Sequence, residues 1–200
     1  MSKQTTLCYI RREDSYLMLH RIKKEQDENR DKWIGVGGKF EEGESPEDCV
    51  LRETLEETGL TLTDYRYRGL VTFVSDIWPC EYMHLFTATG FTGQLKKCDE
   101  GVLEWLPIRQ LCALPMWAGD RIFLELLERD APFFSLKLVY QGEQLVQAVR
   151  PVGQKNSGNA QPLDFQRRPG SPALKKRRFF FQGQFLDILV NCHGDLSFSL

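Results

Sequence analysis

Short runs in which apolar and polar residues alternate recur along the first 150 residues, as expected for strands that cover a core. Apolar residues follow a helical spacing in two places, between Ser45 and Gly59 and over residues 119–128. Many strands with two main helices favour an α/β sandwich around a mixed sheet. We predict strands at residues 7–11, 16–21, 65–75, 81–89, 133–140 and 144–149.

The helix between Ser45 and Gly59 has signals at both ends. Ser45 can cap the first backbone amides, Pro46 suits the first helical position, and Gly59 suits the stop. We expect Leu51 and Leu55 to face the core.

The opposite face of this helix carries Glu53, Glu56 and Glu57, with Arg52 beside them. Residues three and four apart are neighbours on a helix, so like charges there cost about 0.2–0.5 kcal/mol per pair. Such crowding indicates a bound cation, and carboxylate oxygens suit Mg²⁺ or Mn²⁺ shared with substrate phosphates. A solvated acidic face is the alternative interpretation.

Glycines just before the helix favour the metal interpretation. Gly35, Gly37 and Gly38 allow the backbone to approach a ligand closely. Five residues separate Gly38 from Glu44, and seven separate Glu44 from residues 52–60, which read RETLEETGL. This motif resembles the box of the Nudix family, the MutT-type pyrophosphohydrolases.

The resemblance implies a Nudix-type α-β-α sandwich around a mixed sheet and hydrolysis of a diphosphate linkage. It also implies that Glu53 and Glu57 are the main metal ligands, together with the carbonyl of Gly37. Glu56 would be a third ligand or the acceptor of the proton from water, and Arg52 would orient Glu53.

Four other residues bear on this site. Glu100 matches the place from which many MutT-like enzymes bring another glutamate to the metals, so it is a candidate ligand and base; a surface carboxylate is the alternative. Lys39 can contact a phosphate or be solvated. Glu44 precedes the helix and is expected to act structurally. Thr54 stands where the family has a larger aliphatic residue, and its hydroxyl can bond back to the preceding turn.

Trp117 and Asp120 are candidates for recognising the base. Residues 116–120 resemble a segment of a MutT homologue in which tryptophan stacks on a purine and the following acids read its edge. Here Gly119 stands in place of the first acid. Phe73 can line the same pocket by strand alternation. The alternative is a core tryptophan followed by an ordinary first-turn acid.

By resemblance, the substrate is a nucleoside triphosphate, and Mg²⁺-dependent hydrolysis releases a nucleoside monophosphate and pyrophosphate. Oxidised purines such as 8-oxo-dGTP are the expected targets. The alternatives are hydrolysis of another nucleoside diphosphate derivative, such as ADP-ribose, and an inactive nucleotide-sensing protein. The complete acidic set of the helix argues against the sensor.

Charge divides the chain unevenly. Residues 151–200 carry seven basic and three acidic side chains, a net charge of +4, which leaves −6 for residues 1–150 of a whole-chain charge of −2. We therefore predict a Nudix domain over 1–150 and a basic, disordered tail over 151–200. The basic run 175–178 is interpreted as solvated, so no stable nucleic-acid partner is expected.

Composition favours a cytoplasmic enzyme. No apolar run is long enough to span a membrane, the first residues have no secretory-signal pattern, and the six cysteines form no Cys-x-x-Cys pair. We expect free thiols and no membrane partner. The sequence leaves the oligomeric state open.

Overall fold

The computed structural model describes residues 2–23, 27–150, 175–181 and 184–190. They belong to two units, residues 1–153 and 154–200, and each unit is described by itself. The elements, in chain order, are β1 (Lys3–Arg12), β2 (Ser15–Arg21), β3 (Trp33–Ile34), α1 (Pro46–Thr58), β4 (Leu60–Ser75), β5 (Glu81–Gly93), β6 (Gly101–Pro107), the 3₁₀ helix η1 (Ile108–Ala113), α2 (Ala118–Glu128), β7 (Phe134–Gln141), β8 (Gln144–Val149), β9 (Lys175–Phe181) and β10 (Gln184–Val190).

In the described part of the first unit, eight strands form one mixed sheet. Seven follow the order β3-β2-β1-β5-β4-β7-β8, and β6 pairs with β2. Strand β1 runs parallel to β5, and β4 runs parallel to β7, whereas the other neighbours are antiparallel. The mixed sheet expected from the sequence is confirmed.

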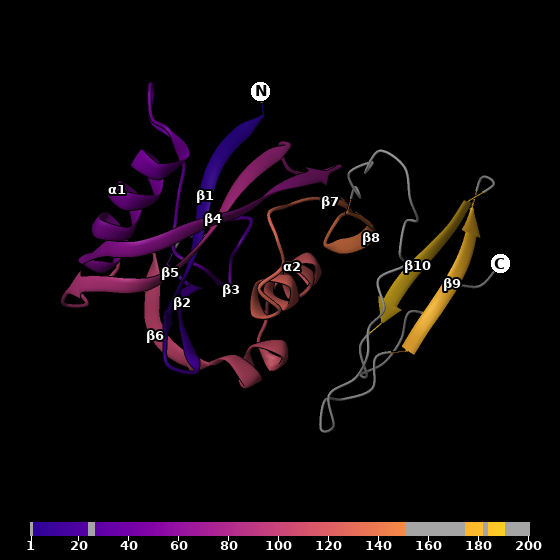
Figure 1. The fold of residues 1–200 in the computed structure, drawn as a ribbon. Helices are drawn as coiled ribbons and strands as arrows, with labels where there is room; N and C mark the ends of the chain where they lie inside the picture. The colour runs from indigo at the N-terminus through magenta and orange to yellow at the C-terminus, as the bar shows by residue number, and fades with distance from the viewer. Residues whose placement is uncertain (1, 24–26, 151–174, 182–183, 191–200) are drawn as a thin grey trace. The chain divides into compact units, whose positions relative to one another are not determined.

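The two α-helices cover opposite faces of this sheet (Figure 1). Leu7 and Tyr9 of β1 belong to the same core cluster as Phe123 of α2. Cys8 belongs to the other cluster, together with Val50 of α1. Because successive side chains of a strand point to opposite faces, this division gives the α-β-α sandwich that the resemblance implied.

Helix α1 begins and ends where the sequence predicted. The Ser45 hydroxyl accepts a hydrogen bond from the Asp48 amide at 3.1 Å, and the Asp48 carboxylate accepts one from the Ser45 amide at 3.0 Å. Pro46 is the first helical residue. Gly59 ends the helix with φ 77°, and its amide donates to the Leu55 carbonyl at 2.9 Å. Both ends are therefore fixed by local chemistry.

The core-facing side of α1 differs from the prediction. Leu55 is 49% exposed, so its expected contact with the core is wrong. Val50, Thr54 and Thr58 are buried instead, at the four-residue spacing of one helix face, and Leu55 lies one residue round the helix from that face. The buried Thr54 hydroxyl has no hydrogen-bond partner in the described part of the chain, so the expected bond to the preceding turn does not form.

This difference gives a stability prediction. Val50→Ala removes fully buried methyl groups and is expected to cost about 2 kcal/mol of unfolding free energy. Leu55→Gln changes an exposed position and is expected to stay within about 0.5 kcal/mol of the wild type. Urea titrations of the two variants measure both values. A larger loss for Leu55→Gln than for Val50→Ala would contradict this assignment of the buried face.

Most of the remaining predicted elements of the first unit are present, but two strands of this unit were not predicted. The expected strands lie within β1, β2, β4, β5, β7 and β8, apart from Phe133, which precedes β7 and is 61% exposed. The helix over 118–128 agrees with the apolar spacing. Strands β3 and β6 are additions, and β6 pairs with β2 along its whole length. That pairing is long-range, which explains why residues 101–107 carry no clear local signal.

The second unit contributes the strands β9 and β10, which pair antiparallel from Lys175 with Val190 to Phe181 with Gln184. The sequence predicted a disordered tail over residues 151–200, and β9 and β10 lie within it; residues 151–174, 182–183 and 191–200 of that tail lie outside the described residues. The domain boundary near residue 150 therefore stays a prediction. No helix in the described part of the chain combines the length and apolar character needed to cross a membrane.

Candidate active site

A glycine-containing segment runs beside β1 and meets α1. The Thr6 amide donates to the Gly38 carbonyl at 2.8 Å, which holds the segment against the strand. Gly37 has φ 152°, and a Cβ atom there would lie 2.2 Å from the Thr6 carbonyl oxygen, so only glycine fits. The Gly37 amide donates to Glu57 Oε2 at 3.0 Å. The loop and the helix thus converge as the sequence indicated.

Glu57 is the most deeply buried of the carboxylates predicted to hold the metal, with 8% of its surface exposed. The pKa of Glu57 is raised to about 8, chiefly by burial; the Gly37 amide acts against the rise, and the charges of Glu100 and Glu53 add to it. Glu57 therefore lies in a cluster of like charges and favours a proton or another cation.

The Glu53 side chain occupies space beside Gly38 that a side chain at residue 38 would fill. The Glu53 side chain is 16% exposed, and a Cβ atom on Gly38 would lie 2.4 Å from the Glu53 carboxyl carbon. Burial raises the pKa of Glu53, an effect opposed by Arg52 and reinforced by the charges of Glu56 and Glu100. The position of this carboxylate thus depends on the absence of a side chain at residue 38.

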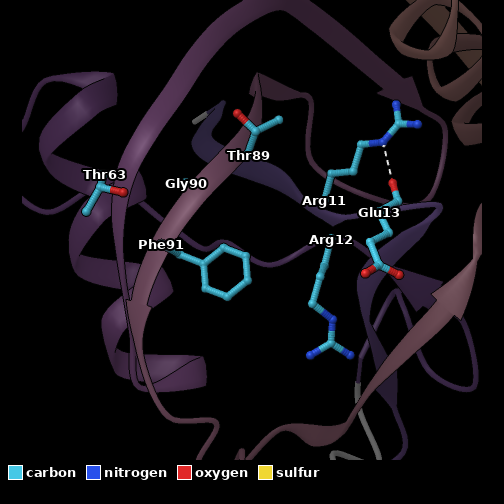
Figure 2. A pocket seen from close by; sticks show the side chains of 7 residues that line it. All are labelled: Arg11, Arg12, Glu13, Thr63, Thr89, Gly90 and Phe91. Carbon is cyan, nitrogen blue, oxygen red and sulfur yellow. Dashed lines mark hydrogen bonds between the residues drawn. The ribbon is translucent and has the colours of Figure 1, made fainter.

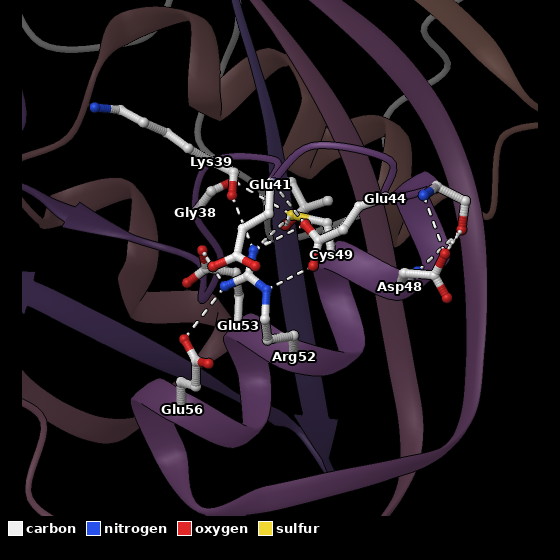
Figure 3. Close-up of polar contacts among 11 residues, drawn as sticks. Gly38, Lys39, Glu41, Glu44, Asp48, Cys49, Arg52, Glu53 and Glu56 are labelled. Atoms are coloured by element: carbon white, nitrogen blue, oxygen red, sulfur yellow. Dashed lines mark hydrogen bonds and ion pairs between the residues drawn. The ribbon is translucent and has the colours of Figure 1, made fainter.

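Arg52 ties the helix carboxylates to the preceding loop (Figure 3). Its Nε and Nη2 atoms donate to the two Glu44 oxygens at 2.6 and 2.9 Å, and its Nη1 donates to Glu53 at 2.9 Å. The bidentate bond to Arg52 lowers the pKa of Glu44 to about 2. Arg52 thus fixes Glu53, and Glu44 acts structurally through Arg52 rather than through the helix amides.

Glu56 and Lys39 lie at the solvent side of this cluster. Glu56 is 60% exposed and accepts from Arg52 Nη1 at 3.2 Å. The Lys39 carbonyl accepts from Arg52 Nη2 at 3.0 Å, and its side chain extends away from the arginine (Figure 3). Both residues are accessible to a ligand that approaches from solvent.

Glu100 reaches the same cluster from the loop before β6. It forms an ion pair with Arg21, the last residue of β2. Arg21 also donates to Asp27 at 2.8 Å and lies 4.0 Å from Glu57. Burial acts to lower the pKa of Arg21, but the bond to Asp27 and the charges of Glu100, Asp27 and Glu57 outweigh it and raise the pKa. The structure therefore brings Glu100 to the helix carboxylates.

Arg21 is a site residue that the sequence reasoning missed. Its side chain is only 12% exposed although it is always charged. A charged residue that ends an apolar strand is a weak signal, because such residues usually mark the return of the chain to solvent. The carboxylates that hold Arg21 come from three separate segments, so the sequence does not show them as neighbours.

Phe73, Trp117 and Asp120 lie together on the other face of the sheet, where α2 packs. The Phe73 and Trp117 rings meet edge to face with centroids 5.7 Å apart, and both pack against Tyr140. Trp117 and Phe73 are each 7% exposed. The core interpretation of Trp117 and the base-pocket interpretation both predict this aromatic cluster.

Residues of the segment before β3 contact both the nitrogen and the ring face of the Trp117 indole. The indole Nε1 donates to Asn29 Oδ1 at 2.8 Å, and the Lys32 ammonium lies 4.4 Å from the ring centroid. Lys32 also pairs with Glu143 at 3.0 Å. A base that stacks on this indole must therefore displace Lys32 from the ring.

Asp120 is buried beside these rings, with 6% of its surface exposed. Burial raises the pKa of Asp120 to about 8; Arg121 and Lys32 act against the rise, and Glu81 adds to it. No hydrogen bond or ion pair to its carboxyl group is formed within the described residues. An ordinary first-turn acid would be solvated, so this one is unusual.

A separate hollow of about 500 Å³ lies beside the last residues of β1 (Figure 2). Arg11, Arg12 and Glu13 line one side, and Thr89 and Phe91 of β5 line the other. None of the predicted site residues lines this hollow. The candidate chemistry is therefore not located there.

The donor set fits a hard divalent cation. Glu53 and Glu57 are poorly solvated carboxylates that repel each other and Glu100, a situation that a divalent ion relieves. In the described residues no three acidic, histidine or cysteine side chains stand in a ligating arrangement. Arg21 and Arg52 compensate the charge through Glu100 and Glu53. A bound ion would take over part of that compensation.

Comparison with known proteins decides the family. The model of the NUDIX domain matches residues 1–127, which is more than half of the chain. The chain belongs to the Nudix family. Helix α1, the glycine segment and the sandwich thus agree with one assignment, and the protein is a hydrolase.

Individual relatives agree with a MutT-like Nudix hydrolase. The chain is 34% identical over 130 residues to the Nudix hydrolase YvcI of Bacillus subtilis (strain 168), which covers 62% of this chain and 78% of that protein. It is 32% identical over 117 residues to the oxidized purine nucleoside triphosphate hydrolase of Danio rerio, and this match covers 58% of this chain and 74% of that protein. The crystal structure of a MutT protein from Bacillus halodurans matches with a TM-score of 0.66 and 28% identity, and the match covers 74% of this chain and 97% of that protein.

The two glycines of the Nudix site give contrasting predictions. The Cβ atom that Gly38→Ala introduces would collide with the flexible end of the Glu53 side chain. We therefore expect a folded protein in which this carboxylate is displaced and turnover is lowered about 10- to 100-fold. The Cβ atom that Gly37→Ala introduces would collide with the Thr6 backbone, and residue 37 has a φ that alanine rarely adopts. We therefore expect this variant to lose about 3 kcal/mol or more of unfolding free energy. Thermal melts and initial rates separate the two effects. Wild-type turnover in folded Gly38→Ala would contradict the role given to Glu53.

Proposed function

We propose that this Nudix hydrolase is a Mg²⁺-dependent nucleoside triphosphate pyrophosphohydrolase that removes oxidised purine nucleotides such as 8-oxo-dGTP. The observation that carries the chemistry is the convergence of Glu53, Glu57 and Glu100 beside the Gly37–Gly38 segment. The name of the zebrafish relative, an oxidized purine nucleoside triphosphate hydrolase, supports the substrate class.

The residues divide into holding and positioning groups. Glu53 and Glu57, with the Gly37 carbonyl and either Glu56 or Glu100, would hold Mg²⁺; Mn²⁺ suits the same oxygens. The ion supplies positive charge to the phosphate oxygens and favours ionisation of water. Arg52 orients Glu53, and Arg21 orients Glu100, through the ion pairs described above.

The remaining groups bind substrate and move one proton. Lys39 would contact a phosphate as a point charge. Water attacks phosphorus in line while the bond to the leaving oxygen breaks, so a nucleoside monophosphate and pyrophosphate are released. The proton from water passes to Glu56 or Glu100, which are the two carboxylates nearest to solvent.

Base recognition would use the aromatic cluster on the other face of the sheet. Trp117 offers an indole face and Phe73 an edge, and stacking on such a platform contributes about 1–3 kcal/mol per base. The ammonium of Lys32 already lies over the indole, which is consistent with a face suited to a flat, polarisable group. Asp120 provides a polar group at the edge of the platform.

A nucleotide panel with Mg²⁺ tests the proposal. We expect kcat/KM for 8-oxo-dGTP to exceed that for dGTP by about tenfold or more, with 8-oxo-dGMP and pyrophosphate as products. Chromatography of the nucleotides and a pyrophosphate assay identify both products. Equal kcat/KM values for the two nucleotides, or release of inorganic phosphate as the first product, would contradict the proposal.

A further inference from the structure

The hollow beside the end of β1 opens where two strands of the sheet separate. Strands β1 and β5 pair in parallel as far as Ile10 and Ala88. Beyond that pair, Arg11 and Arg12 of β1 line one side of the hollow, and residues 89–91 of β5 line the other (Figure 2). Side chains from both faces of a sheet can reach such an end, so two consecutive arginines contribute to one hollow.

The guanidinium group of Arg12 rests on an aromatic ring. It lies 4.2 Å from the centroid of the Trp105 indole, and the Phe91 ring stacks on the same indole with centroids 5.6 Å apart. A guanidinium stacked in this way keeps its N–H groups, which lie in its own plane, available as donors. Within the described residues, no carboxylate forms an ion pair with Arg12. Its charge is therefore balanced by solvent or by a ligand.

The Arg11 side chain is fixed at one point and has donors to spare. Its Nε donates to the carbonyl of Glu13 at 2.8 Å. Its two Nη atoms lie 3.8 Å from carboxylate oxygens of Asp14 and Glu128. Both separations are longer than a hydrogen bond, so these ion pairs are loose. A ligand in the hollow can thus reach the Nη groups without breaking a hydrogen bond to a side chain.

The neighbouring arginines of β4 are compensated more closely. Arg66 and Arg68 line a second hollow of about 330 Å³, which shares Arg11 with the first. Asp130 pairs with Arg66 at 3.2 Å and with Arg68 at 2.8 Å. In the first hollow, by contrast, two arginines face a single lining acid, Glu13. The uncompensated positive charge is therefore in the first hollow.

We propose that the hollow beside β1 is a second ligand site, which binds the phosphate group of a small anion between Arg11 and Arg12. Each guanidinium offers paired N–H donors that match phosphate oxygens. A phosphate group carries nearly two negative charges at neutral pH, which suits two arginines better than the single charge of a carboxylate does.

The other walls of the hollow suit a phosphate with or without an organic group. Thr63 of β4 adds a hydroxyl donor, and Phe91 adds an apolar ring. The volume of about 500 Å³ is that of a small-molecule site. A free phosphate ion and an organic phosphate ester share the recognised chemistry. None of the residues assigned to hydrolysis lines this hollow, so the site does not depend on the proposed function.

Arginine side-chain NMR tests the site without requiring hydrolysis. The Nε–Hε signals of protein carrying ¹⁵N-arginine are followed near pH 7 at constant ionic strength, with EDTA present so that no metal draws phosphate to the active-site carboxylates. Inorganic phosphate is added in one titration and adenosine monophosphate in another. We expect the Arg11 and Arg12 signals to move together, with a Kd on the order of 1–10 mM for this solvent-exposed site. A lower Kd for adenosine monophosphate identifies an organic phosphate as the source, and equal values identify the free ion.

Three variants separate a built site from a general effect of charge. Arg12→Gln removes one set of donors, so the Arg11 signal should need about tenfold more phosphate to shift. Arg12→Lys keeps the charge but not the planar fork, and should weaken binding about threefold or more. Arg66→Gln is the matched control, because it removes the same charge from a side chain that Asp130 already pairs. It should bind phosphate like the wild type.

Thermal melts check that the variants are folded, and if Arg12→Gln does not fold, Arg12→Lys takes its place. The inference is overturned if phosphate moves neither arginine signal more than sodium chloride of equal ionic strength does. It is also overturned if the folded Arg12 variants bind phosphate as tightly as Arg66→Gln, because the anion would then respond only to net charge.

Discussion

Glu57→Gln is expected to lower metal-dependent turnover by about 100-fold or more, because it removes a charged ligand while changing few atoms. The glutamine side chain of this variant has no negative charge to offer a divalent ion. Its amide oxygen can still accept the hydrogen bond from the Gly37 amide, which measures 3.0 Å with glutamate. The variant should therefore fold, and the loss should appear in the rate rather than in the amount of native protein.

The measurement is a Mg²⁺ titration of initial rates with a saturating nucleotide, together with far-ultraviolet circular dichroism and a thermal melt. Glu47→Gln is the matched control, since Glu47 is an exposed acid in the first turn of the same helix. It should keep wild-type turnover. If Glu57→Gln hydrolysed nucleotide at the wild-type rate with the same Mg²⁺ dependence, Glu57 would not be a ligand.

Asp120→Asn is expected to stabilise the protein at alkaline pH and to leave its stability unchanged near pH 4. Burial raises the pKa of Asp120 in the folded state to about 8, from an ordinary value of 3.8. A raised pKa means that the folded state binds the proton more tightly, so this stabilisation is complete below about pH 4 and is lost as pH rises towards 8. Each unit of pKa difference is worth about 1.4 kcal/mol, so a difference of about four units corresponds to a loss of up to about 6 kcal/mol.

Urea titrations of the wild type and Asp120→Asn at several values between pH 4 and pH 9 measure this effect. The difference between the two proteins should grow steadily with pH, because asparagine has no proton to lose. Asp14→Asn is the control, since the Asp14 side chain is fully exposed and should show no such trend. A difference that does not change with pH would show that Asp120 is ionised at neutral pH and solvated in the folded protein.

Part of the site could be predicted because it is encoded within a few residues. The Ser45 cap, the Gly59 stop and the common face of Glu53 and Glu57 depend on contacts no more than four residues apart. Such contacts follow from helix geometry alone. The glycines at 37 and 38 belong to the same class, since their spacing from the helix forms one continuous motif.

Other features required the packed sheet. Leu55 is exposed although it was expected to face the core, because the face of α1 that is buried depends on how the helix lies on β1 and β4. Arg21 looks like an ordinary strand end until Glu100, from a loop 79 residues away, is brought against it. Strand β6 is recognisable only through its pairing with β2.

The sequence by itself determined the family motif, the ends of helix α1 and the mixed class of the fold, because these depend on local periodicity and on residues that are close along the chain. The tertiary structure alone decided that Glu100 and Arg21 join the helix carboxylates, and that Glu81 lies opposite Phe73 in the sheet. The physical reason is strand register, which is set by long-range hydrogen bonds and burial and places residues together that no local pattern connects.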